Sequence, residues 1–281
     1  MNERILAQEA INRYADHLHS EEKASSTVQN YLRDIYAFTA WLGGKPVTKE
    51  AVVLWRDEML SHHLSANTVN TKLSAVNSLL SFLGWGDCRA KSLKVQQCVF
   101  RDPERELTKE DYFKLLNTAA RKGQERLGLL VETIAATGIR VSELAYVTVE
   151  AAKAREAVIR LKGKIRKVFL PRSLARKLEK YAKRHKITTG EIFRTRTGTP
   201  MTRGQIWREM KTLAEKAGVA ASKVFPHNLR HLFATVFYQS CQDIVKLADL
   251  LGHSSINTTR IYLMTTGVEH ARKIEEMGLS L

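Results

Sequence analysis

Two basic side chains near the C-terminal end of the chain have the types and the spacing to bind an anion. His227 and Arg230 stand three positions apart, directly after Pro226. Proline is well tolerated at the first position of a helix, and residues three apart share one helical face. The N-terminus of a helix attracts anions through its free N–H groups. The spacing therefore predicts a helix that starts at Pro226 and presents both side chains to an anionic group.

A histidine and a tyrosine follow in the same part of the chain. Residues 243–251 place apolar side chains at helical spacing, and Gly252 is suited to end that helix, which puts His253 on the next turn. Tyr262 comes nine positions later, in a connection rich in Ser, Thr and Asn. Such residues favour caps and exposed backbone over a packed core. We therefore expect Tyr262 to reach a substrate from a segment that can move.

A further basic residue, Arg140, stands two positions after the helix-breaking pair Thr137-Gly138, which ends a predicted helix over 124–136. Glu143 stands three residues further on, so a surface ion pair worth a few tenths of a kcal/mol is one interpretation. An arginine beside a glycine turn is also well placed to donate two parallel hydrogen bonds to a phosphate. We favour this second interpretation, in which Glu143 holds Arg140 in position.

The same residues lie in short sequence boxes whose order and spacing are distinctive. HNLRH at 227–231, LGH at 251–253 and Tyr262 resemble the C-terminal signature of the tyrosine recombinases, the phage-integrase family of site-specific DNA strand-exchange enzymes. TGIRVSEL at 137–144 resembles the first arginine box of that family. The resemblance implies that Tyr262 is the nucleophile, and that the other catalytic residues include Arg140, His227, Arg230 and His253.

The resemblance also implies a reaction and an assembly. DNA would be cut and rejoined through a 3′-phosphotyrosyl intermediate and a Holliday junction, without metal, cofactor or ATP. Four protomers would assemble as a tetramer on double-stranded DNA with paired inverted-repeat core sites. In the family a C-terminal tail, here residues 265–281, docks on a neighbouring protomer, and packing on its own domain is the alternative. Integration, excision and dimer resolution are all compatible with these residues.

The catalytic lysine of the family lies on the turn of a β-hairpin, commonly in a G-K-G-x-K run. The pattern of residues 158–171 predicts such a hairpin. Its turn reads L-K-G-K and lacks the first glycine, so Lys162 is the residue that aligns with the lysine before the remaining glycine. Lys164 is the alternative, because alternation along an extended chain points both side chains the same way.

The basic charge of the chain is concentrated in its C-terminal part. The 281 residues carry a net charge of +16, and residues 151–200 alone hold 16 Lys and Arg against 3 Glu. A polyanion is the natural partner of such a surface. Five basic residues are predicted as DNA phosphate contacts: Lys164, Arg166, Arg176, Lys180 and Lys183.

The hydrophobic pattern predicts a mainly α fold with a small antiparallel β element. Helices are expected over 3–20, 27–42, 48–64 and 67–83, which form an N-terminal four-helix bundle. The family resemblance implies that this bundle is the core-binding domain. We predict a DNA-binding domain over 1–86, a linker over 87–106 and a mixed α/β catalytic domain over 107–281. The polar face of the fourth helix is by itself typical of an ordinary solvated face. Its segment NTKLSAVNSLL resembles the helix that crosses the DNA groove in the family, and this resemblance favours Asn70 and Lys72 as DNA contacts.

Other features narrow the function class. No apolar run is long enough to span a membrane, and no signal pattern precedes the first helix, so a cytoplasmic, nucleoid-associated protein is expected. The three Cys lack metal-site spacing. Because the bundle begins near Met1, the plan resembles the simpler Xer-like recombinases or those of mobile genetic elements such as transposons. A topoisomerase of the tyrosine type, a non-catalytic DNA-binding regulator and an RNA-binding module are the alternatives.

Overall fold

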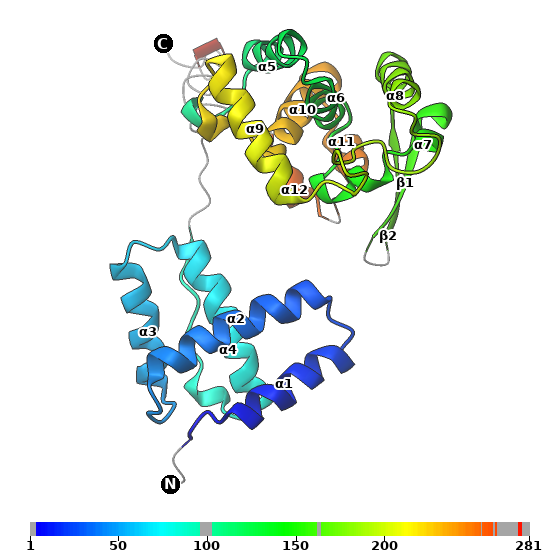
Figure 1. Cartoon of the computed structure of the whole chain (residues 1–281). Coiled ribbons are helices and arrows are strands. Elements are labelled where there is room, and N and C mark those ends of the chain that lie inside the picture. Colours follow the sequence, from blue (N-terminus) through cyan, green and yellow to red (C-terminus); the bar gives the residue numbers. More distant parts are fainter. Residues whose placement is uncertain are drawn as a thin grey trace. The chain divides into compact units, whose positions relative to one another are not determined.

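The computed structural model describes residues 4–95, 103–161, 164–253, 255–260, 262 and 275–276. The chain divides into two compact units, Met1–Gln97 and Cys98–Leu281 (Figure 1). Most of the described residues are helical, and the only strands among them form one two-stranded antiparallel sheet. The predicted fold class, mainly α with a small antiparallel β element, is confirmed.

The N-terminal unit contains the predicted bundle. Side-chain caps start two of its helices: Thr48 accepts from the Ala51 amide and Ser65 accepts from the Thr68 amide. The bundle core is formed by fully buried apolar side chains, among them Ile11, Ile35, Phe38, Leu73 and Leu79. The helices are α1 (Gln8–Ser20), α2 (Ser25–Leu42), α3 (Lys49–Ser61) and α4 (Ala66–Phe82).

Two asparagines on α4 hold the chain segment that follows the helix. The Asn70 side chain accepts from the Leu93 amide at 2.7 Å and donates to the Leu93 carbonyl at 2.9 Å. Asn77, two turns further on the same face, makes the same pair of bonds with Ala90 at 3.2 and 2.9 Å. The segment 86–93, which begins with the short 3₁₀ helix η1 (Gly86–Cys88), therefore packs on the bundle, although the sequence assigned it largely to the linker.

Lys72 also has a partner inside the N-terminal unit. Its ammonium lies 3.1 Å from the carboxylate of Asp34, whose side chain is only 2% exposed. A carboxylate buried to this degree requires a cationic partner, because an unpaired charge in the core is costly. Asn70 and Lys72 thus have structural roles, and their DNA contacts stay a prediction.

The C-terminal unit is organised around α6 (Glu125–Thr137), which contacts α5, α8 and α10. Leu130, Val131 and Ile134 on α6 are completely buried. Capping boxes at Thr108 and Thr202 start two of the surrounding helices. The remaining helices are α5 (Lys109–Arg121), α7 (Val149–Ala154), α8 (Arg172–Arg184), α9 (Arg203–Ala217), α10 (Pro226–Cys241), α11 (Ile244–Leu251) and α12 (Ile256–Arg260), with 3₁₀ turns η2 (Pro103–Arg105), η3 (Val141–Tyr146) and η4 (Ala221–Lys223).

The predicted hairpin is confirmed as strands β1 (Glu156–Leu161) and β2 (Lys164–Phe169). Its inner face buries Ala157, Ile159 and Val168. Arg166 is paired with Ile159 across the ladder, so opposite residues share this inner face. β2 begins at Lys164, inside the stretch that the sequence assigned to the turn, and Lys162 and Gly163 lie outside the described residues.

Candidate active site

The first arginine box follows the end of α6. Gly138 caps this helix with φ +63°, and a Cβ there would collide with Phe233 and Leu251, so only glycine suits the position. Arg140 stands two positions later and is held by Glu143 as the sequence predicts. The Arg140 amide donates to Oε2 of Glu143 at 2.8 Å, and Nη1 of its guanidinium donates to Oε1 at 2.9 Å.

The second arginine box lies on α10, which begins with Pro226 as predicted. His227 keeps a large part of its surface exposed, whereas Arg230 is only 3% exposed. The guanidinium of Arg230 donates to the carbonyl of Gly138 and, at 2.7 Å, to the carbonyl of Leu251. These bonds fix Arg230 between the end of α6 and the end of α11.

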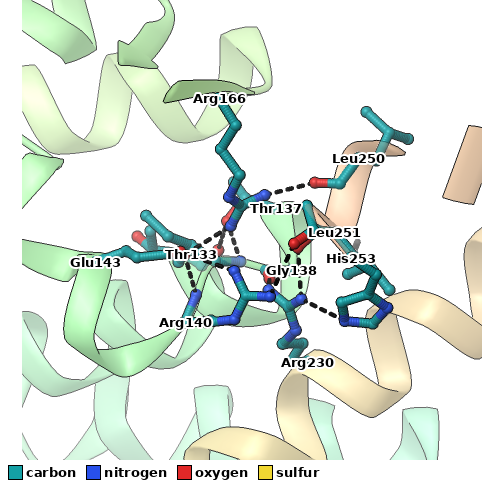
Figure 2. Close-up of polar contacts among 12 residues, drawn as sticks. Thr133, Thr137, Gly138, Arg140, Glu143, Arg166, Arg230, Leu250, Leu251 and His253 are labelled. Carbon is teal, nitrogen blue, oxygen red and sulfur yellow. Dashed lines mark hydrogen bonds and ion pairs between the residues drawn. The ribbon is translucent and has the colours of Figure 1, made fainter. Parts of the chain in front are cut away.

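Three guanidiniums converge on the C-terminal end of α11 (Figure 2). The carbonyls at the end of a helix have no partners within it and form the negative end of its dipole. Here three successive carbonyls, those of residues 250–252, each accept from a different arginine. The three bonds are Arg166 Nη1 to Leu250 at 2.6 Å, Arg230 Nη2 to Leu251 at 2.7 Å and Arg140 Nη2 to Gly252 at 3.1 Å.

Glu143 joins two of these arginines. Its side chain is 3% exposed and lies 2.9 Å from Arg140 and 2.6 Å from Arg166. Burial is the largest single influence and raises the pKa of Glu143, but the hydrogen bonds from Arg166 and Arg140 and the charge of Arg166 together outweigh it, so that the pKa is lowered. Arg166 was predicted as a DNA contact, but its side chain points into the site and is only 13% exposed.

The cluster has more positive than negative charge. Within the described part of the site three guanidiniums stand against one carboxylate, that of Glu143, which pairs with Arg140 and Arg166 but not with Arg230. Burial, followed by the charge of Arg140, lowers the pKa of Arg230 to about 10. Arg230 therefore stays protonated at neutral pH, and a phosphate bound beside it would relieve the repulsion between the cations.

His253 is a neutral histidine whose hydrogen bonds identify its tautomer. Its Nε2 lies 3.0 Å from Nη2 of Arg230, which can only donate, so Nε2 is the acceptor. The ring proton is then on Nδ1, which donates to the hydroxyl of the fully buried Thr259 at 2.9 Å. Burial, followed by the charges of Arg230 and Arg140, lowers the pKa of His253 to about 4.

Tyr262 lies inside the site of its own chain and is 5% exposed. Its ring centroid is 4.9 Å from that of His231, 5.8 Å from that of His253 and 6.4 Å from that of His227. The ring also packs in an apolar cluster of which Leu251 is a member. The structure thus brings the predicted nucleophile and the predicted phosphate-binding residues together.

Two family models match the chain in the order of its two units. The model of the N-terminal SAM-like domain of phage integrases matches residues 11–86, and that of the phage integrase family matches residues 105–267. The chain belongs to the phage integrase family. It is therefore a tyrosine recombinase, an enzyme that cleaves and rejoins DNA strands in site-specific recombination. The resemblance read from the arginine, histidine and tyrosine boxes is confirmed.

Relatives in the phage integrase family match over nearly the whole chain. Tyrosine recombinase XerA of Pyrococcus furiosus is 27% identical over 99% of this chain and 97% of its own, and tyrosine recombinase XerD of Brucella melitensis is 31% identical over 92% and 93%. Among solved structures, a lambda integrase dimer bound to a COC′ core site has a TM-score of 0.73, with 18% identity over 92% of this chain and 95% of that one. This structural similarity supports the two-domain recombinase fold.

The structure does not place the predicted general acid, and the basic residues that the charge pattern predicted as DNA contacts on α8 have no partner in the described part of the chain. Lys162 lies outside the described residues, and of Lys164 only the backbone is described. Arg176, Lys180 and Lys183 are exposed on one face of α8 and form no hydrogen bond or ion pair within the described ranges. Their roles in catalysis or DNA binding stay predictions.

Sequence reasoning missed three features of this recombinase site. His231, which contacts the Tyr262 ring, lies one helical turn after His227, so its position in the HNLRH box could have indicated it. Thr259 lies on α12, a short helix in the connection that was expected to have exposed backbone. The inward direction of Arg166 had no local signal, because strand alternation does not say which face is covered.

No described group of three His, Cys, Asp or Glu side chains could hold a metal ion. Likewise, none of the described helices is long and apolar enough to span a membrane.

Proposed function

We propose that Tyr262 attacks the scissile phosphate of a DNA core site while four side chains hold that phosphate: Arg140, His227, Arg230 and His253. One observation carries this proposal. The Tyr262 ring lies among the three imidazoles of residues 227, 231 and 253, next to the buried guanidinium of Arg230. Nucleophile and anion-binding groups thus belong to one site of one chain.

The cluster supports such a reaction because its donors are already fixed. A phosphodiester resists attack until the charge that grows on its oxygens is stabilised. Arg230 is held by the carbonyls of Gly138 and Leu251, and Arg140 is held by Glu143. Neither arginine has to be reorganised when a phosphate arrives. Over a third of the Arg140 side chain is exposed, at 37%, which leaves it accessible to DNA.

The two histidines would act in different ways. Partial burial, followed by the charges of Arg230 and Arg140, lowers the pKa of His227, so its neutral ring can accept the phenolic proton of Tyr262. His253 accepts from Arg230 in the free protein. A bound phosphate adds negative charge beside this ring and raises the pKa of His253. Protonation of Nε2 ends the bond that it accepts from Arg230, which stays held by the carbonyls of Gly138 and Leu251, and the new N–H can then donate to the phosphate.

The proposed covalent step exchanges one phosphate ester bond for another and needs no cofactor. The Tyr262 oxygen forms a bond to phosphorus, and the bond from phosphorus to the 5′-oxygen breaks. Lys162 is proposed to give the proton that this 5′-oxygen needs, with Lys164 as the alternative. Because a phosphotyrosyl ester replaces a phosphodiester, the bond energy is conserved and rejoining needs no ATP.

The protein would assemble as a tetramer on two DNA sites with inverted-repeat core elements. It would act in the cytoplasm, on the DNA of the nucleoid. Support comes from relatives: lambda integrase was solved as a dimer on a core site, and XerH was solved bound to its difH substrate. An apolar groove of about 390 Å³ between α5, α6 and α10 would receive the 265–281 tail of a neighbouring protomer. Its walls include Phe113, Ala136, Leu232, Val236 and Phe237.

The nucleophile can be tested once a core site has been selected by binding from a randomised duplex library. Wild-type protein on a nicked suicide duplex carrying this site should form a covalent protein–DNA adduct, visible by denaturing electrophoresis. Tyr262→Phe should bind the duplex and form no adduct. The control is Tyr238→Phe, a second tyrosine of the same apolar cluster. An adduct that persists in Tyr262→Phe but is lost in Tyr238→Phe would move the nucleophile to Tyr238.

A further inference from the structure

Arg166 differs from a DNA contact in the direction and the burial of its head group. Its Nη1 donates to the carbonyl of Leu250 and its Nη2 donates to Glu143, both at 2.6 Å. The Nε atom is buried and has no hydrogen-bond partner among the described residues. With 13% of the side chain exposed, little of the guanidinium can reach a phosphate on a DNA surface.

The side chain of Arg166 packs closely against Gly252. Gly252 has φ +63°, and a Cβ at this position would collide with the Arg166 side chain. The glycine is therefore needed twice, for its left-handed backbone and for the close approach of the arginine. A buried donor without a partner is unfavourable, and an aliphatic side chain on the inner face of β2 would avoid this cost. The arginine at this position is therefore explained by the two bonds that its head group makes.

Those two bonds join the hairpin to Glu143, beside Arg140, and to the C-terminal end of α11. Glu143 holds Arg140 through its amide and its guanidinium. Leu250 lies at the last turn of α11, directly before the carbonyls of Leu251 and Gly252 that Arg230 and Arg140 use. His253 follows on the same turn. A shift of this turn or of Glu143 would therefore displace the phosphate-binding groups together.

We propose that Arg166 is a positioning residue of the active site, which acts through Glu143 and the C-terminal end of α11 and does not bind DNA. The inference rests on the proposed strand cleavage by Tyr262. It assigns Arg166 to the rate of the chemical step, whereas a phosphate contact would contribute to DNA affinity.

The test measures single-turnover cleavage and DNA affinity separately, with the nicked duplex that carries the selected core site. Arg166→Met should lower the cleavage rate at saturating protein by roughly 10–100-fold, because a small displacement of the groups that hold the phosphate is costly to the rate. Its dissociation constant and the salt dependence of binding should change less than twofold. The matched control is Lys167→Met, which removes the same charge from the next residue of β2, where the side chain is 62% exposed. That variant should cleave at the wild-type rate.

Two further variants separate positioning from a general loss of structure. Arg166→Lys keeps the charge but cannot make both bonds, so its cleavage rate should lie between those of wild type and Arg166→Met. In a Glu143→Gln background, Arg166→Met should add much less than its effect alone, because both changes act through one carboxylate.

Three outcomes would overturn the inference. Weaker binding with a reduced salt slope and a wild-type rate at saturation would make Arg166 a DNA contact. Independent, multiplicative effects of Arg166→Met and Glu143→Gln would remove the proposed route. Loss of the native circular dichroism spectrum in both Arg166 variants would give the residue a purely structural role. Absence of any adduct with wild-type protein would instead refute the proposed function.

Discussion

The C-terminal unit holds two groups of basic side chains in contrasting environments. At the end of α11, the guanidiniums of Arg140, Arg166 and Arg230 are fixed by carbonyls and by Glu143 (Figure 2). On α8, Arg176, Lys180 and Lys183 are exposed and form no ion pair within the described ranges, so their side chains are surrounded by solvent.

The difference indicates what each group can contribute. Donors that are fixed before a substrate arrives stabilise a transition state without reorganisation. Exposed cations release counterions from DNA and so contribute affinity that depends on salt, but they do not fix a geometry. We therefore expect the α11 group to control the rate of cleavage and the α8 group to control the strength of binding.

The largest effect should come from Lys162, a cation outside both groups, if it supplies the proton for the leaving oxygen. Lys162→Ala should slow cleavage of normal DNA by about 10²–10⁴-fold, the usual contribution of general acid catalysis. A 5′-bridging phosphorothiolate leaves as a thiol and needs little protonation, so this substrate should restore most of the rate. Lys164→Ala is the matched control, and rescue of that variant alone would reassign the acid.

A conservative substitution in the α11 group should also reduce the rate strongly. Arg230→Lys keeps the charge but loses the planar fork that bonds to Gly138, Leu251 and His253. We expect cleavage at saturating protein to fall by about 10²–10³-fold, the typical cost of losing one fixed donor. Arg176→Lys is the same chemical change on α8 and should leave the rate unaltered. Equal effects of the two substitutions would remove the distinction between the groups.

Removing charge from α8 should weaken binding instead. A triple variant should reduce the slope of log affinity against log salt by about 2–3, one unit for each phosphate that is no longer neutralised. In this variant Gln replaces Arg176, Lys180 and Lys183. The single-turnover rate at saturating protein should be retained. A control changes Lys177 and Arg184, which already pair with Glu132 and Glu125, and its slope should change less. A greatly reduced cleavage rate in the triple variant would place these residues in the chemistry.

The smallest effect concerns His253, which contacts the α11 group, and the change in the free energy of unfolding with pH. A free histidine has a pKa near 6.5, and burial together with the nearby arginines lowers the pKa of His253 to about 4. Between these values the unfolded chain binds the proton more readily than the folded chain, so stability falls as the pH decreases. Between pH 7 and pH 5 the free energy of unfolding of the wild-type protein should decrease. His253→Asn should make this decrease smaller by on the order of 1 kcal/mol, after allowance for partial solvent exposure. Urea unfolding at both pH values measures this, and an unchanged loss would contradict it.

Local patterns in the sequence were sufficient for the secondary structure around the site. Pro226 starts α10, Gly138 and Gly252 end α6 and α11, and Glu143 pairs with Arg140 three residues away. Each of these features depends on residues within about one helical turn. The sequence boxes also led correctly to the recombinase family and to a mainly helical fold with one hairpin.

Tertiary contacts decided the partners of the charged and polar side chains. Arg166 meets the Leu250 carbonyl 84 positions away, and Arg140 meets that of Gly252 112 positions away. In the N-terminal unit, the polar face of α4 covers the segment at Ala90 and Leu93 through Asn77 and Asn70. Periodicity identifies a polar face and the residues that share it. It does not distinguish DNA, water and another chain segment as the partner, because each can satisfy the same hydrogen bonds and only packing determines which one is near.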